Sequence, residues 1–305
     1  MNLRQAHYLK TIAKEGSITA AAKHLMISQP SLSQTLRQIE TDCGAILFER
    51  RGSSLVPTYA GECCLRAASQ LLNTNEVLEN ELREIRGEKR GLLRLGISMQ
   101  RASHTLPQIL PAFFREYPNV ELRLLEAGSA KLEQYVLDGT ADLALLSAEP
   151  VQPQLSYRLL CKERIGILTG PGSPIATKIP VGTPISLTSA AEMNCRFLSL
   201  KSGHNARIVQ DRLLLEHGLH PVFALETDSM EAAQRIAQTA GLCLICTDSC
   251  LPADACFYPI KNCGNERHFY ACTKKGAHIP QYMEFLIRCA KEACFMPSQA
   301  ARRSQ

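Results

Sequence analysis

Residues 16–50 read GSITAAAKHLMISQPSLSQTLRQIETDCGAILFER. The stretch contains two short helical patterns of apolar residues separated by a tight break, and the second pattern leaves small polar side chains exposed. Such a pair is typical of a helix-turn-helix, whose second helix lies in the major groove of DNA. We therefore expect a DNA reader near the N-terminus and expect the remaining chain to control it.

Helix start and stop signals surround this break. Gly16 can end a first helix over Leu3–Glu15 in the left-handed conformation, and Ser17 can cap a second helix. Ser28 is a good N-cap for a third helix, because Pro30 then falls in the first turn, where no backbone N–H is needed. The sequence thus predicts three helices in the first 43 residues.

The third helix is predicted to expose a polar face. Glutamine can bond adenine through two atoms, serine can bond bases or phosphates, and proline can touch a thymine methyl group. A helix N-terminus also favours a phosphate. A solvated surface would have the same composition, so both interpretations stay open on the residues alone. The candidate DNA contacts on this helix are Ser28, Gln29, Pro30, Ser31, Ser33, Gln34 and Arg37.

A predicted wing follows the third helix. Residues 46–52 and 55–58 have the pattern of two short strands joined by a turn, which would bring Arg50 and Arg51 near phosphates or the minor groove. Residues 1–58 carry seven Lys and Arg against four Asp and Glu, a balance compatible with DNA binding. The first domain is therefore expected over 1–58.

The segment resembles the winged helix-turn-helix of LysR-type transcriptional regulators. The resemblance implies that Gln29, Pro30, Ser33, Gln34 and Arg37 face the groove and that Arg50 and Arg51 belong to the wing. Many members carry Arg where Gln34 stands, so this chain lacks a positive charge at that position. The residues that carry the resemblance are Gly16-Ser17, Ala20-Ala21, Leu25, Ser28 to Ser33, Ile39-Glu40, Gly44, Leu47 to Arg50, Pro57-Thr58 and Gly61.

A long helix is predicted over 58–86, where Gly61 is the single glycine and proline is absent. An apolar seam at alternating spacings of four and three residues indicates pairing with a second copy, with Asn75 fixing the register; packing on its own domain is the alternative. The resemblance implies the same linker role. Residues 59–90 thus form a linker helix that ends in a hinge at 88–91. The seam comprises Cys64, Ala68, Leu71, Asn75, Leu78, Leu82 and Ile85, of which the last five are the candidate dimer contacts.

From residue 91 onward, strand and helix patterns alternate, which favours largely parallel sheets covered by helices. Predicted strands are 92–98, 120–126, 141–147, 164–169, 196–200, 222–227, 241–247 and 268–273, and predicted helices are 103–117, 129–137, 205–217, 229–239 and 280–295.

Polar residues follow the ends of several predicted strands. Ligands of such sheets gather beyond the carboxyl ends of strands, near helix N-termini, so these residues can form a cleft for a small anion. Capping of the following helices is the simpler interpretation of each residue taken alone. The candidate effector contacts are Ser98, Gln100, Ser129, Ser202, His204 and Thr247.

The stretches Leu137 to Leu145, Leu106 to Pro118 and Ala240 to Leu242 are similar to the LysR-type effector domain. The resemblance implies an α/β domain over 91–296 with two subdomains, as in periplasmic binding proteins. The expected limits are 91–163 with 264–296 for the first subdomain and 164–263 for the second. The tail over 297–305 is expected to be unstructured.

Cysteine chemistry offers a rival to ligand sensing. Cys243 and Cys246 have the spacing of metal and dithiol sites, but residues three apart in a strand point to opposite faces. Peroxide-sensing members of the family use a cysteine pair in the effector domain. Cys195 lies in a comparable stretch, yet the next cysteine is Cys243, so the sequence does not favour this alternative. No metal or cofactor site is expected, and most of the thirteen cysteines should pack as buried thiols.

An enzyme or an exported solute-binding protein is less well supported. His204, His217, His220 and His268 are scattered, and no Gly-rich phosphate loop is present. The opening MNLRQAHYLK mixes charged and apolar residues unlike a signal peptide, and no apolar run reaches the ~18–20 residues that span a bilayer. We therefore expect a cytoplasmic regulator, not an enzyme, without membrane contact.

The expected mechanism joins these parts. A homodimer, or a tetramer built from two dimers, would bind an interrupted inverted repeat of double-stranded DNA. A small effector in the C-terminal cleft would change the spacing of the DNA readers and the access of RNA polymerase.

Overall fold

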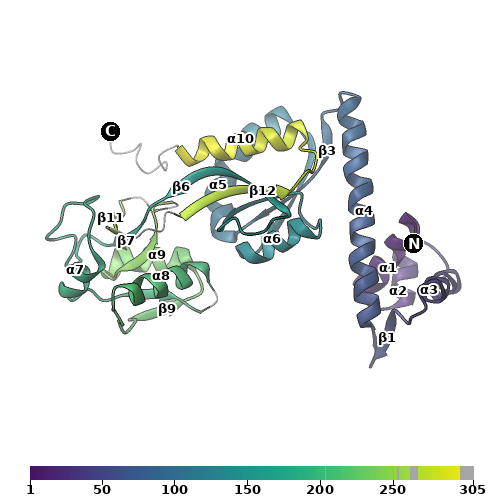
Figure 1. Cartoon of the computed structure of the whole chain (residues 1–305), viewed down its shortest axis with the longest axis horizontal. Helices are drawn as coiled ribbons and strands as arrows, with labels where there is room; N and C mark the ends of the chain where they lie inside the picture. Colours follow the sequence, from purple (N-terminus) through teal and green to yellow (C-terminus); the bar gives the residue numbers. More distant parts are fainter. Residues whose placement is uncertain (203, 250, 253, 262–266, 296–305) are drawn as a thin grey trace.

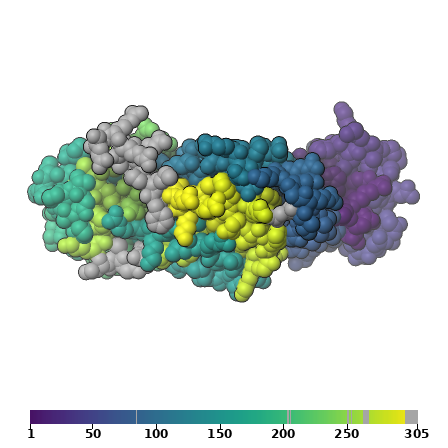
Figure 2. All heavy atoms as spheres, turned by 90° about the horizontal axis from the view of Figure 1, so that it is seen from above, coloured from purple at the N-terminus to yellow at the C-terminus, as the bar shows by residue number. Residues whose placement is uncertain are grey.

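The computed structural model describes residues 1–202, 204–249, 251–252, 254–261 and 267–295. The chain forms an elongated row of three bodies, with the N-terminal helices at one end and the long helix α4 beside them (Figure 1). The view from above in Figure 2 shows the same elongation. The predicted tail over 297–305 and the subdomain limit at Gly264 lie outside the described residues.

The N-terminal body contains the three predicted helices and the hairpin. Helix α1 covers Leu3–Glu15, α2 covers Ile18–His24 and α3 covers Gln29–Cys43. Gly16 ends α1 in the left-handed conformation, and the Ser17 and Ser28 side chains cap α2 and α3, as predicted. Strands β1 (Phe48–Arg51) and β2 (Ser54–Pro57) pair antiparallel. Their core is formed by Tyr8, Leu9, Ile12, Ala21, Ala22, Leu32, Leu36, Ile39, Leu47 and Phe48.

Helix α4 covers Tyr59–Ile85 and starts in close contact with the hairpin. A Cβ atom on Gly61 would lie 2.0 Å from the Leu47 carbonyl oxygen, so only glycine allows this approach. The Thr58 hydroxyl donates to the Ile46 carbonyl oxygen at 2.7 Å. The beginning of α4 is therefore fixed to the N-terminal body.

The first sheet module has one five-stranded sheet of order β4-β3-β5-β12-β6. β3 pairs parallel with β4 and β5, whereas β12 pairs antiparallel with β5 and β6. Helices α5 and α10 cover one face and α6 covers the other. The elements are β3 (Arg90–Ile97), α5 (Met99–Glu116), β4 (Asn119–Glu126), α6 (Ser129–Leu137), β5 (Leu143–Ser147), β6 (Leu155–Glu163), β12 (Arg267–Lys274) and α10 (Gln281–Phe295).

The second sheet module contains a three-stranded antiparallel sheet of order β10-β7-β11 and a parallel pair, β8 and β9. Helices α7 and α8 pack on one face of the three-stranded sheet, and α9 packs on the other. The elements are β7 (Ile165–Thr169), α7 (Leu187–Glu192), β8 (Leu198–Leu200), α8 (Asn205–Glu216), β9 (Leu225–Thr227), α9 (Met230–Ala240), β10 (Leu244–Thr247) and β11 (Cys256–Pro259).

The structure corrects three expectations. The prediction of largely parallel sheets is wrong for the three-stranded sheet of the second module and for β12, because chain segments that return between the modules enter the sheets in the opposite direction. Strands β6 and β11 and helix α7 were not predicted, and α5 begins at Met99 instead of Ser103. Arg90 and Gly91, two residues of the predicted hinge, pair with β4 as the first residues of β3.

Candidate nucleic-acid interface and effector cleft

The polar face of α3 is exposed along its first two turns. Six of the seven predicted contacts on this helix are exposed, and the seventh, Ser33, is half-buried. The Gln29 amide donates to the Ser33 hydroxyl at 2.7 Å, which holds the glutamine side chain along the helix. Leu32, Leu36 and Ile39 on the opposite face are buried in the N-terminal core. The helix therefore presents its polar face to a partner without losing core contacts.

Several polar groups of this surface are free to bind. Among the residues that the structure describes, Gln34, Arg37 and Arg50 make no side-chain hydrogen bond or ion pair. Arg51 is instead paired with Glu49 at 2.8 Å within the wing. Free guanidinium groups on α3 and in the wing suit a phosphate backbone. Arg37 and Arg50 are thus better placed than Arg51 to contact an anion.

The turn between α2 and α3 holds a residue that the sequence did not indicate. Met26 has a φ of 54°, in the left-handed region, and its side chain is 93% exposed. Non-glycine residues rarely adopt this conformation. Methionine gives no sequence signal for it, so only the backbone geometry reveals a strained turn between the two helices.

Helix α4 has two contrasting faces. Leu78, Leu82 and Ile85 of the predicted seam are 52, 41 and 80% exposed. The first part of the seam differs, because Ala68 is fully buried and Cys64 packs on the N-terminal core. The beginning of the seam thus packs on the N-terminal body, as in the alternative to pairing, whereas its last three residues are exposed.

The face opposite the exposed leucines contacts the first sheet module through Asn73 and Glu76. The Arg94 guanidinium of β3 donates to the Asn73 side chain and pairs with Glu76 at 3.2 Å. Asp142 holds the same guanidinium from the other side at 2.7 Å. Burial opposes the charge of Arg94, but these carboxylates outweigh it and raise the pKa of the guanidinium. The charged face therefore anchors α4 to the first sheet module.

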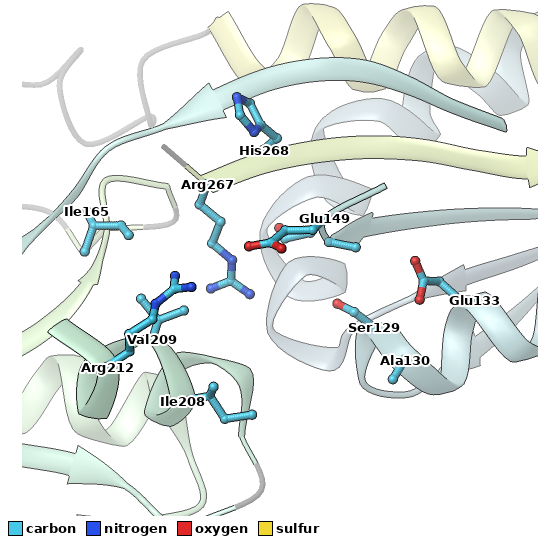
Figure 3. Close-up of a pocket in the computed structure, with 12 residues that line it drawn as sticks. Ser129, Ala130, Glu133, Glu149, Ile165, Ile208, Val209, Arg212, Arg267 and His268 are labelled. Atoms are coloured by element: carbon cyan, nitrogen blue, oxygen red, sulfur yellow. The ribbon is translucent and has the colours of Figure 1, made fainter. Parts of the chain in front are cut away.

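A cavity of about 310 Å³ lies between the two sheet modules. Ser129 and Glu133 of α6 line one side, and Ile208, Val209 and Arg212 of α8 line the other. Figure 3 shows Arg267, the first residue of β12, pointing between these two helices. The remaining lining residues are Ala130, Ser147, Ala148, Glu149, Ile165 and His268. The cavity is thus partly apolar and carries charges from both modules, as a ligand site requires.

The two guanidiniums of this cavity lack carboxylate partners. Across the described residues, the side chains of Arg212 and Arg267 make no hydrogen bond or ion pair. Burial lowers the pKa of Arg267, and the neighbouring Glu163 offsets this only in part. Glu133 already accepts the Tyr157 hydroxyl at 2.6 Å. A ligand anion at Arg267 would supply the negative charge that this guanidinium lacks in the protein.

Of the six predicted effector contacts, only Ser129 lines this cavity. Ser98 precedes α5 and His204 precedes α8, where His204 lies 3.6 Å from the Asp228 carboxylate. Thr247 bonds Ser249 at 2.6 Å. Gln100 and Ser202 also lie outside the lining. Arg212 and Arg267 were not predicted, because Arg212 lies inside helix α8 and Arg267 begins a strand instead of following one.

The structure brings together one cysteine pair that the sequence separates. Cys195 packs against the core cluster that contains Cys243. The neighbouring Cys243 thiol lowers the pKa of Cys195; burial opposes this, and Lys178 acts in the same direction as Cys243. Cys195 and Cys243 are therefore neighbours in the fold, although they lie far apart in the sequence. Cys243 and Cys246 belong to different core clusters, on opposite faces of β10 as predicted. Within the described residues, no cluster of three metal-ligating side chains occurs, and no helix is long and apolar enough to cross a membrane.

Comparison with known families assigns both parts of the chain. Residues 3–62 match the model of the bacterial regulatory helix-turn-helix protein, lysR family, and residues 86–295 match the LysR substrate binding domain. The chain is 32% identical over 178 residues to the HTH-type transcriptional regulator YtlI of Bacillus subtilis, a match that spans 58% of each chain. It is 24% identical to the regulator CbbR of Rhodospirillum rubrum over 96% of both chains.

Solved structures share the fold. Full-length OxyR from Pseudomonas aeruginosa superposes with a TM-score of 0.72 at 20% identity, covering 95% of both chains. Full-length CbnR, solved in complex with its target DNA, superposes with a TM-score of 0.64 at 21% identity, covering 96% of this chain and 100% of CbnR.

Proposed function

The chain belongs to the LysR family of bacterial transcriptional regulators, and we propose that it reads an interrupted inverted repeat of double-stranded DNA through α3. The observation that carries the proposal is the exposed polar face of α3 with the unpaired side chain of Arg37, together with the unpaired Arg50 in the wing. LysR regulators bind DNA, as the CbnR complex shows for that protein. Ser28, Gln29, Pro30, Ser31, Ser33, Gln34 and Arg37 are the proposed contacts of α3, with Arg50 and Arg51 in the wing.

Selection from a randomised duplex pool tests this reading. The full-length protein is expected to enrich two half-sites related by a two-fold axis, because the symmetry of a dimer is mirrored in its site. Binding should weaken steeply as salt rises, since phosphate contacts release counterions. A pool that shows no enrichment, or a single half-site without symmetry, would contradict the proposal.

The proposed dimer forms through the exposed apolar face of α4. Asn73 and Glu76 of α4 face the first sheet module. The proposed dimer contacts lie on the opposite side of the helix and comprise Leu71, Asn75, Leu78, Leu82 and Ile85. An exposed apolar stripe on a long helix is typical of a helix that pairs with another. A tetramer built from two such dimers, and contact with RNA polymerase, would extend the same assembly.

We further propose that the cavity between the sheet modules binds a small organic acid. The unpaired guanidiniums of Arg212 and Arg267 come from different modules, so a carboxylate between them would draw the modules together. Differential affinity for the two arrangements then shifts their populations. The Arg94 contacts carry any movement of the first module to α4, and through α4 to the DNA readers.

A thermal-shift screen of the full chain tests the effector class. Carboxylic acids and amino acids are expected to raise the unfolding temperature, whereas the uncharged amides of the hits are not. Arg267→Ala and Arg212→Ala should each remove the shift. Arg235→Ala is the matched control, because its guanidinium is 74% exposed on α9 and lies outside the cavity lining. Equal shifts with acids and amides would contradict an anionic ligand.

Thiol sensing is a second candidate function, favoured by the contact of Cys195 with Cys243. A peroxide would then oxidise the Cys195 thiol, and Cys243 would complete a disulfide. The test compares DNA binding with and without peroxide after reducing preparation. A peroxide response that survives Cys195→Ser and Cys243→Ser would exclude this pair.

A further inference from the structure

We propose that Cys43 and Cys64 form a reversible disulfide that joins the proposed DNA-reading helix to the linker helix. Cys43 is the last residue of α3, and Cys64 lies in the second turn of α4. Their sulfur atoms are 3.9 Å apart. A disulfide needs about 2.05 Å, so rotation of the two exposed or half-buried side chains can close the gap.

Contacts of the surrounding backbone hold the end of α3 and the beginning of α4, and with them the two thiols, close together. The Glu40 carboxylate accepts the Leu47 N–H at 2.8 Å, which ties the last turn of α3 to the segment before β1. Gly61 packs against the Leu47 carbonyl, and the Thr58 hydroxyl donates to the Ile46 carbonyl. The same short segment thus contacts both helices, so bond formation does not require the domain to unfold.

Cys43 is the thiol that an oxidant meets first. It is exposed, whereas Cys64 is half-buried, and burial together with its neighbour Cys43 raises the pKa of the Cys64 thiol. The adjacent Cys63 has a different partner, because its sulfur accepts the Arg66 guanidinium at 3.0 Å. Cys43 is therefore expected to form its disulfide with Cys64 and not with Cys63.

A hydroperoxide supplies the oxidation. The Cys43 thiolate attacks a peroxide oxygen, so that an S–O bond forms, the O–O bond breaks, and the leaving alkoxide or hydroxide takes a proton. The Cys64 sulfur then attacks the resulting sulfenic acid; the S–S bond forms, the S–O bond breaks, and water leaves with the Cys64 proton. Two thiols and one hydroperoxide give one disulfide, one alcohol or water, and one further water. A dithiol reductant restores both thiols.

The consequence is a fixed angle between reader and linker. The disulfide would close a loop of the chain that contains the whole wing, between residues 43 and 64. Because α4 is also the helix proposed to pair with a second copy, the bond would couple the oxidation state to the rigidity of each DNA reader. This site is separate from the Cys195 and Cys243 pair in the second sheet module.

Peptide mapping of the full-length protein tests the bond directly. Trypsin cuts after Arg37, Arg50, Arg51 and Arg66, so Cys43 and Cys64 fall in separate peptides, 38–50 and 52–66. After stoichiometric hydrogen peroxide, these peptides should appear joined, with the loss of two hydrogens, and should separate again with dithiothreitol. Amide hydrogen exchange within 38–66 should slow at least about threefold in the oxidised protein.

Matched variants keep the test decisive. Cys63→Ser should form the linked peptides as the native chain does, whereas Cys43→Ser and Cys64→Ala should not and should show no slowing of exchange. Mixing with isotope-labelled protein separates bonds within one chain from bonds between two. Linkage through Cys63, linkage only between chains, or Cys43 oxidised to the sulfinic acid without any linked peptide would each overturn the proposal.

Discussion

Arg94 on β3 and Asp142 before β5 form a half-buried, two-point ion pair, with the guanidinium Nη2 2.7 Å from Oδ1 and Nε 3.1 Å from Oδ2. The Asp142 carboxylate also accepts the backbone N–H of Arg94 at 2.8 Å. The remaining face of the guanidinium meets Asn73 and Glu76 on α4. One arginine therefore joins the sheet of the first module to the helix that leads to the DNA reader.

Arg94→Ala is expected to lower the free energy of unfolding by about 2 kcal/mol, because it leaves the half-buried Asp142 carboxylate without its charged partner. Arg94→Lys should recover only part of this, since an ammonium group cannot bond both carboxylate oxygens in the same way. Urea titration of the full chain measures the loss. Arg123→Ala is the control, because its pair with Glu121 is exposed and should contribute less than about 1 kcal/mol. Equal losses for the two alanine variants would refute the special role of Arg94.

Gly139→Ala tests the second contact between α4 and the first module. Gly139 has a φ of 78°, and an added Cβ would lie 2.4 Å from the Asn73 side-chain nitrogen. We expect a loss of at least about 1–2 kcal/mol. In an Asn73→Ala background the loss should shrink by at least about 0.5 kcal/mol, because part of the clash is gone. Gly128→Ala should be nearly neutral, since its φ is −70° and no heavy atom lies within 4 Å.

Met26→Gly is expected to stabilise the protein by about 0.5 kcal/mol, because glycine adopts the left-handed turn without strain and the exposed methionine buries little surface. Chemical denaturation measures the gain. Leu25→Gly is the opposite case, since Leu25 has a φ of −80° and packs on the N-terminal core. It should lose more than about 1 kcal/mol. A destabilised Met26→Gly variant would show that the turn is not strained.

Leu78→Asp with Leu82→Asp is expected to convert the proposed dimer to a monomer, since each chain would bury two charges in the proposed apolar contact between α4 helices. Sedimentation velocity at several concentrations gives the mass. Tyr59→Asp is the control, because Tyr59 is an 80% exposed apolar residue on the same helix outside the seam. A double variant that keeps the native mass places the dimer contact elsewhere.

The first fifty residues were predictable because their structure is encoded locally. Caps at Asn2, Ser17 and Ser28 and left-handed glycines at 16 and 44 begin or end the helices, whatever the rest of the chain does. The buried positions of α3 likewise follow from helical spacing alone.

Long-range pairing explains what the sequence did not reveal. Strand β11 has only four residues and ends in Pro259, so its own sequence does not identify it as a strand. Its extended conformation depends on pairing with β7. Nothing in the local sequence of α4 indicates that Arg94, on a later strand, reaches Asn73 and Glu76. The Ser129 contact was predicted because it follows a strand end, whereas Arg212 and Arg267 reach the cavity only through the packing of two modules.

Helix α3 is the central element of the proposed function, because it is assigned to read the DNA sequence. Gln29→Ala with Arg37→Ala should weaken binding to the selected duplex at least about thirtyfold, and the salt dependence should fall by about one phosphate contact. Gln38→Ala is the matched control on the same helix, because Gln38 bonds Asp42 at 2.7 Å and lies outside the proposed contact set. The decisive measurement is fluorescence anisotropy with the selected and a scrambled duplex at several salt concentrations. We predict that the double variant loses discrimination between them while Gln38→Ala keeps it; a double variant that still discriminates as the native protein does would contradict the assignment of α3.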